Sequence, residues 1–454
     1  MQKAPPPQIQ PVYRQPVQQP PRQPPYHQVA PAASVEVIEE FEGFDEDPGE
    51  EITEEEYEAG KRRLRRRRVA GTVGATVLGI LAALVVFVLL LGPSALPYVD
   101  SFQPTALQQS DVATPLVPGW DPEMGDEPPT PSGGTGANAQ YIITWVTSPV
   151  FVDRGGSMRI NITNRGTMDI YVEQVRMYPE WTDDMIYFAT SFGHYVSPGE
   201  EVPVGLLGFD GPSAPGIYLY HFEVDLMVKR PVLDSWVDIQ PQAHDDFEME
   251  VRPVESITPY ETHRNDKSVY RKVNDLIDPD DPRVRELADQ VSEGLGDEYN
   301  LYWIASLFDW VIDELDYRSD PSEGDEWAPP GETCDSMAGD CEDYSILIAS
   351  VVEHWGGNAQ FYIITKHAFA AVYLGPRTMD VNAVVDALDS YYGTSARYSW
   401  FVDDLGYWII ADGTSSQYLG GLPYNGVATD MQGGWDIEDT DYLYITDIYP
   451  HYPE

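Results

Sequence analysis

The stretch Gly339-Asp340-Cys341-Glu342-Asp343-Tyr344-Ser345 places a cysteine directly after a Gly-Asp pair and directly before an apolar run. Apolar side chains then recur at three- and four-residue steps, which predicts one buried helix face: Tyr344, Leu347, Ile348, Val351 and Trp355. The pair Gly356-Gly357 is typical of a helix end. Cys341 is therefore expected at a helix N-terminus, where unpaired N–H groups and the helix dipole lower the pKa of a thiol.

Strand patterns follow the predicted helix. Gln360–Ile364 reads as a strand, His367–Leu374 is a second strand that opens on a histidine, and Tyr407–Thr414 is a third that carries Asp412 near its end. A thiolate nucleophile needs a general base, and the base needs a third group to fix its tautomer. The chain order Cys341, His367, Asp412 predicts such a triad, although each residue also has a structural interpretation as a buried cysteine, a surface histidine or a turn aspartate.

These stretches resemble the transglutaminase-like superfamily of papain-like cysteine enzymes, in an archaeal-type form. The family's catalytic Cys, His and Asp fall on Cys341, His367 and Asp412. The resemblance implies an α+β fold, with the Cys on a helix packed against an antiparallel sheet that bears the His and the Asp. Members include cross-linkers, peptidases, amidases and inactive relatives, so the reaction type stays open. The matching pieces lie between about residues 309 and 416: Trp310-Val311-Ile312, Leu315-Asp316-Tyr317, Trp327 to Thr333, Gly339 to Ser345, and the two strands with His367 and Asp412.

Other residues of the motif have supporting roles. In the family a tryptophan upstream of the Cys often helps to line the acyl site, and Trp310 or Trp327 is the candidate here, with core packing as the alternative. Gly339, Asp340 and Asp343 support the motif, and we expect the two aspartates to serve the turn and the helix cap rather than to bind a cation. The predicted chemistry requires no metal and no cofactor.

A long insert separates the predicted base from its orienting carboxylate. Residues 379–400 contain a helix-like pattern and an aromatic tail, and would form a lid, a specificity loop or a decorated surface. Asp403 and Asp404 precede a glycine and indicate a turn, so Asp412 is the better third member of the triad.

The charge of the chain excludes one class of function. Its 454 residues include 27 Lys and Arg against 75 Asp and Glu, a formal net charge of -48. Such a chain does not bind nucleic-acid phosphates as its main activity. The acidic excess keeps a protein soluble and suits a high-salt, for example archaeal, source. The two cysteines, Cys334 and Cys341, argue against a disulfide-built fold, but a bond between them would block the nucleophile.

The N-terminal part predicts a membrane anchor. Residues 1–60 are rich in Pro and Gln and then acidic, which indicates a disordered tail. A basic block follows at 61–68, and 69–91 is an uncharged apolar run of about 23 residues, long enough for one transmembrane helix. The basic flank predicts a cytoplasmic N-terminus and extracellular C-terminal domains at the cell membrane. Small residues in the apolar run would also let two copies pair through this helix.

The remaining chain predicts two folded domains after a flexible linker at 92–139. Short alternating strands between turn clusters at 140–254 predict an all-β immunoglobulin-like sandwich, and 255–454 is the transglutaminase-like α+β domain. We expect a membrane-anchored cysteine peptidase, amidase or acyltransferase that acts on protein or peptide amides. The alternative is a catalytically silent binding or assembly module of the cell surface.

Overall fold

The computed structural model describes residues 104–107, 125–132 and 139–448, with gaps at 184–185, 231–233, 255, 321–325 and 431–432. Two regions within these ranges carry regular structure: an all-β region up to about residue 254, and a region of helices and strands from 261 onward.

The all-β region consists of two sheets. One has the order β1-β3-β7, and the other has the order β2-β9-β8-β4-β5, with β6 paired to β4. Alternation explains the packing: Met158, Ile160 and Ile162 on β3 are fully buried, and they share one core with Val172 and Phe222 of the other sheet. The strands are β1 (Tyr141–Thr147), β2 (Val150–Phe151), β3 (Gly156–Asn164), β4 (Ile170–Pro179), β5 (Phe188–Ala189), β6 (His194–Val196), β7 (Glu201–Phe209), β8 (Gly216–Arg230) and β9 (Ser235–Arg252).

The second region is built on a six-stranded sheet of order β10-β19-β13-β14-β16-β15. β10 runs parallel to β19, and the other neighbours are antiparallel. The strands are β10 (Glu261–Arg264), β13 (Ala359–Ile364), β14 (His367–Gly375), β15 (Trp400–Val402), β16 (Tyr407–Ala411) and β19 (Tyr442–Asp447). Two short pairs complete the strands: β11 (Asp316–Tyr317) with β12 (Ala338–Gly339), and β17 (Gly426–Ala428) with β18 (Trp435–Ile437).

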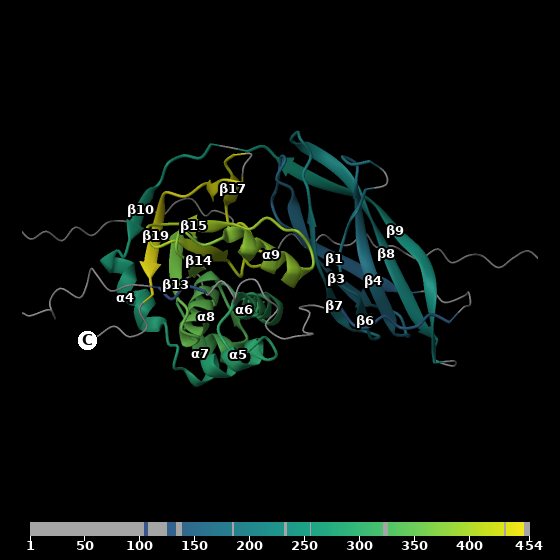
Figure 1. Ribbon diagram of the computed structural model, residues 1–454, viewed down its shortest axis with the longest axis horizontal. Helices are drawn as coiled ribbons and strands as arrows, with labels where there is room; N and C mark the ends of the chain where they lie inside the picture. Colours follow the sequence, from purple (N-terminus) through teal and green to yellow (C-terminus); the bar gives the residue numbers. More distant parts are fainter. Residues whose placement is uncertain are drawn as a thin grey trace, which may run out of the picture. The chain divides into compact units, whose positions relative to one another are not determined.

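Helix α8 packs against β13 and β14, and α5, α6 and α7 pack around α8 (Figure 1). Four helices begin at a residue whose side chain accepts a backbone N–H of the first turn: Asp266, Asp281, Asn300 and Asp380. The bounds are α4 (Lys267–Leu276), α5 (Pro282–Ser292), α6 (Leu301–Glu314), α7 (Pro330–Ser336), α8 (Cys341–His354) and α9 (Val381–Tyr392).

Helix α8 is the central helix of this core. Nearly all its residues are buried, which is typical of a helix enclosed by its neighbours. Its end is fixed by two hydrogen bonds, from Gly356 N–H to the Glu353 carbonyl and from Gly357 N–H to the Val352 carbonyl, with Gly356 at φ 81°. Only glycine adopts this left-handed conformation without strain, so the Gly-Gly pair ends the helix as expected.

The predicted fold class needs correction. We expected an α+β papain-like domain preceded by an immunoglobulin-like sandwich and a single transmembrane helix, whereas the described residues form a mixed α/β structure. Parallel pairing occurs between β2 and β9, β10 and β19, and β11 and β12.

The transmembrane helix, and the cell-membrane location inferred from it, are also corrected. No helix among the described residues is long and apolar enough to cross a membrane. The longest, α6 and α8, have 14 residues each, and crossing a bilayer takes about 20. The segment at 69–91, with the helix pairing expected there, lies outside the described residues.

Candidate active site

Cys341 is the first residue of α8 and follows the helix N-cap Asp340. Its side chain is 7% exposed. The helix packs against β14, and the backbone N–H of Ala368, the second residue of that strand, acts on the Cys341 sulfur and favours the thiolate. The cysteine therefore lies beside the strand that begins with His367.

His367 opens β14, and Asp412 follows the last residue of β16. The two strands are antiparallel neighbours with Ala370 opposite Ala411, and this register brings the histidine and the aspartate together although they are 45 residues apart. His367 Nε2 lies 2.7 Å from Asp412 Oδ2, and both side chains are almost fully buried. The ring nitrogen Nδ1 is left to face a second partner, because Nε2 is used by Asp412.

The Asp412 carboxylate is held from several sides. Oδ1 accepts hydrogen bonds from Thr414 N–H, the Thr414 hydroxyl and Ser415 N–H, and Oδ2 accepts one from Tyr424 N–H. Burial acts to raise the pKa of Asp412, but the charge and hydrogen bond of His367, together with these donors, outweigh it and lower the pKa below its ordinary value. Asp412 thus stays ionised and can orient the His367 ring.

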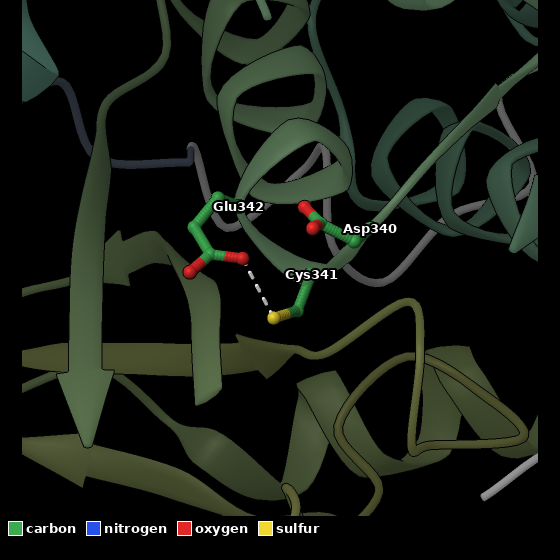
Figure 2. Close-up of side chains that lie close together, drawn as sticks. All are labelled: Asp340, Cys341 and Glu342. Atoms are coloured by element: carbon green, nitrogen blue, oxygen red, sulfur yellow. Dashed lines mark hydrogen bonds between the residues drawn. The ribbon is translucent and has the colours of Figure 1, made fainter. Parts of the chain in front are cut away.

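The thiol has a different environment from the one expected. Cys341 Sγ donates a hydrogen bond to Glu342 Oε2 at 2.8 Å (Figure 2). Burial, followed by the charge and hydrogen bond of Glu342, raises the pKa of Cys341 well above its ordinary value. The prediction that the helix N-terminus lowers this pKa is therefore wrong for the conformation in this structure, because burial and the adjacent carboxylate outweigh the helix dipole.

The motif residues around the cysteine fix the start of α8. Asp343 accepts hydrogen bonds from Ala328 N–H at 2.7 Å and Asp340 N–H at 3.3 Å. Gly339 lies so close that a Cβ there would come within 2.7 Å of the Asp343 Cβ. Asp340 is 7% exposed, and its Oδ1 has no hydrogen-bond partner among the described residues. Burial and the neighbouring carboxylates raise the pKa of Asp340 to about 8.

The two candidate tryptophans occupy different places. Trp310 lies on α6, partly buried against the helical core. Trp327 lies ahead of α7, with its ring 5.5 Å from that of Phe361 and with Lys272 Nζ 3.5 Å above it. Ala328, which follows Trp327, donates a backbone hydrogen bond to Asp343 in the first turn of α8. Of the two tryptophans, Trp327 is therefore the one whose neighbour in the chain contacts the cysteine end of that helix.

The structure also places Cys334, Asp403 and the insert at 379–400. Cys334 on α7 and Cys341 are both free thiols, and burial raises the pKa of Cys334 to about 11. Asp403 accepts hydrogen bonds from Gly406 N–H and Trp408 Nε1 and pairs with Arg264, which makes it a turn residue as expected. The insert at 379–400 contains α9, whose buried face packs into the helical core.

Some residues of the site were not predicted from the sequence. The sequence assigns Glu342 no role of its own, yet Glu342 accepts a hydrogen bond from the Cys341 thiol. Thr414 and Ser415 follow Asp412 directly, and this Asp-Gly-Thr-Ser order was a usable signal for a turn that binds the carboxylate. Tyr424 contributes its N–H to Asp412 and its ring lies 5.0 Å from that of His367, but nothing in the local sequence indicates this.

Comparisons with known proteins add little. No protein-family model matches the chain, and no curated protein matches it. Among solved structures, the chain is similar to a candidate cysteine protease from Cytophaga hutchinsonii at 11% identity and a TM-score of 0.22, covering 70% of this chain and 93% of that one.

Two further likenesses cover smaller parts of the chain. The PapD-like domain 7 of human CEP192 is matched at 12% identity and a TM-score of 0.17, over 30% of this chain and 99% of that one. The sporulation control protein Spo0M of Bacillus subtilis is matched at 13% identity and a TM-score of 0.17, over 25% of this chain and about half, 49%, of that one. Scores this low carry no inference about the function of this chain.

Proposed function

We propose that the chain is a cysteine hydrolase or acyltransferase that attacks protein or peptide amides through a thioester on Cys341. His367 is the general base and later the general acid, and Asp412 orients its ring. The observation that carries the proposal is the buried His367–Asp412 pair at 2.7 Å, beside a cysteine that opens a helix. A buried His–Asp pair at the strand against which a cysteine-bearing helix packs is an arrangement suited to a Cys-His-Asp triad.

The chemical steps follow from this geometry. His367 takes the thiol proton through Nδ1 while Nε2 stays bound to Asp412, and the Cys341 sulfur attacks the amide carbonyl carbon. The backbone N–H groups at the start of α8 face the developing oxyanion. The protonated histidine returns its proton to the departing amine, and the thioester then passes to water or to a second amine.

The resting thiol must first turn away from Glu342, because its proton is bound there at 2.8 Å. This contact supports a second candidate function, a binding or assembly module without turnover. If the thiol never leaves Glu342, the site retains the shape of an enzyme but has no nucleophile. A direct test of acylation separates the two candidates.

The test uses the full-length chain with Cys334→Ser, which leaves Cys341 as the one thiol of the two in the sequence. With a chelator present and p-nitrophenyl acetate as a general acyl donor, we expect a burst of one equivalent of p-nitrophenolate and an acetyl group on Cys341 by mass spectrometry. His367→Ala should slow the burst by about 10²-fold or more. His263→Ala, a partly exposed histidine stacked on Tyr444, is the matched control and should leave the burst unchanged.

A burst that is equally slow in all three proteins would overturn the enzyme proposal and leave the silent module. If the burst occurs, adding glycine methyl ester to the acyl-enzyme measures the partition between water and an amine. A product that is mainly the acetylated amine assigns acyl transfer, and free acetate assigns hydrolysis.

A further inference from the structure

The start of α8 brings two carboxylates and a thiol together. The ligand atoms of Asp340, Cys341 and Glu342 all lie within 4.8 Å of one another. Figure 2 shows the Glu342 carboxylate facing the Cys341 sulfur, with the Asp340 side chain beside them at the start of the helix. A hydrogen bond joins the thiol to Glu342 there.

A second observation indicates that this cluster lacks a ligand. Asp340 is more than nine-tenths buried, and its Oδ1 is enclosed without any hydrogen-bond partner among the described residues. Buried carboxylate oxygens are normally satisfied by a donor or a cation. The capping box at the start of α8 uses the Asp340 side chain for the Asp343 N–H, but Oδ1 is left without a partner. Burial, followed by the negative charges of Glu342, Asp343 and Asp320, disfavours the ionised form of Asp340.

We propose that this cluster binds a divalent cation of the Zn²⁺ class through Cys341 Sγ, Asp340 Oδ1 and a Glu342 oxygen. Zn²⁺ takes thiolate and carboxylate ligands in a compact tetrahedral arrangement, so one such atom from each of these three consecutive residues would suffice, with water as the fourth ligand. Ca²⁺ and Mg²⁺ prefer oxygen ligands only and would not use the sulfur.

Binding replaces a proton by a metal. The S–H bond breaks, the proton leaves to solvent, and the thiolate forms the metal–sulfur bond. The cation also provides Asp340 and Glu342 with a positively charged partner. Because the sulfur is then bound to the metal, it cannot attack an amide; this consequence rests on the proposed function, and it makes the cation a reversible inhibitor of the resting site.

The experiment measures metal binding without activity. The full-length Cys334→Ser chain, freed of metal with a chelator and dialysed, is titrated with Cd²⁺, whose bond to a thiolate gives an ultraviolet charge-transfer band. We expect one equivalent of Cd²⁺ to saturate the band, and added Zn²⁺ to abolish it by displacement. Cys341→Ser should remove the band, while Glu342→Gln and Asp340→Asn should each weaken Cd²⁺ binding by at least about tenfold.

Glu332→Gln, an equal change of charge at an exposed position on α7, is the control and should leave the Cd²⁺ affinity unchanged. Glu342 is only partly buried, so its variant tests the proposal even if Asp340→Asn disturbs the helix cap; circular dichroism and thermal melting verify folding of each. A band that survives in Cys341→Ser, affinities unchanged in both carboxylate variants, or equal displacement of Cd²⁺ by Ca²⁺ would overturn it.

Failure of this proposal is distinguishable from failure of the proposed function. Cd²⁺ binding without an acylation burst keeps the metal site and removes the enzyme. A burst in a protein that gives no Cd²⁺ band keeps the enzyme and removes the metal site.

Discussion

Asp412 and Asp340 are both buried carboxylates of the candidate site, but their surroundings shift their pKa values in opposite directions. Around Asp412, backbone N–H groups and a hydroxyl converge, and His367 Nε2 lies 2.7 Å from Oδ2. Around Asp340, one oxygen has no partner and the neighbouring charges are negative. The surroundings of Asp412 favour its ionised form, and those of Asp340 and Cys341 favour their protonated forms.

A third buried carboxylate, Glu353, identifies what causes the opposite pKa shifts of Asp412 and Asp340. Glu353, near the end of α8, accepts hydrogen bonds from the Asn358 side chain and from Ala359 N–H. Burial nevertheless raises the pKa of Glu353 to about 8. Hydrogen bonds from neutral donors therefore do not offset burial there, and the His367 ring is the feature that Asp412 has in addition.

Replacing Asp412 should have the largest effect. In Asp412→Ala the buried His367 loses its partner and four hydrogen-bond donors lose their acceptor. We expect the free energy of unfolding at neutral pH to fall by about 3–5 kcal/mol, the usual cost of breaking a buried pair. Urea unfolding of the full-length chain measures it.

The pH dependence of that loss has a definite sign. Because the pKa of Asp412 is lowered in the folded state, its stabilisation is present above the unfolded-state pKa and is lost as the pH falls through the folded-state pKa. The gap between the two proteins should therefore close only in strong acid. Asp404→Ala removes a fully exposed carboxylate and should change the free energy of unfolding by less than about 0.5 kcal/mol; an Asp412→Ala effect of that size would contradict the structure.

Replacing Glu353 should raise the free energy of unfolding, whereas replacing Asp412 should lower it. Because its pKa is raised, the folded state binds a proton that the unfolded state has lost, so stability falls as the pH rises from about 4.5 to about 8. Glu353→Gln removes this dependence, and we expect the variant to gain about 2 kcal/mol over the wild type between about pH 5 and pH 8. Urea unfolding at several pH values measures the gain.

The exposed Glu314 at the end of α6 provides the control for this experiment. Glu314→Gln should leave the pH dependence of the unfolding free energy as in the wild type. A Glu353→Gln protein that loses stability by the same amount at every pH would mean that the carboxylate is ionised in the folded state, as Asp412 is.

Local patterns in the sequence predicted the elements that carry the site. The spacing of apolar residues after Cys341 predicted helix α8, because a buried helix face repeats every three to four residues. The pair Gly356-Gly357 predicted its end, because glycine adopts positive φ without strain. The strand that opens on His367 is β14, and the strand that leads to Asp412 is β16. The family resemblance implied one antiparallel sheet that bears both residues, and in the structure β14 and β16 are antiparallel neighbours.

Features that depend on distant residues or on side-chain direction were not predictable. The parallel pairing of β10 with β19 joins segments from the two ends of the domain, which periodicity does not encode. The N–H of Tyr424 reaches Asp412 only through the tertiary fold. Burial of the Cys341 thiol by the tertiary fold, together with its rotamer toward Glu342, reversed the expected shift of the Cys341 pKa.

The contact between Glu342 and the thiol allows a direct test of how the surroundings of Cys341 differ from those of Asp412, and it has the smallest expected effect. In the full-length Cys334→Ser chain with a chelator present, Glu342→Gln removes the negative charge that accepts the thiol proton. Since this charge raises the pKa of Cys341, its removal should increase the thiolate fraction and speed iodoacetamide labelling at neutral pH by about tenfold. Glu332→Gln should label at the unchanged rate. Equal rates in all three proteins would mean that burial alone holds the proton on the sulfur, and would contradict the effect assigned to the Glu342 charge.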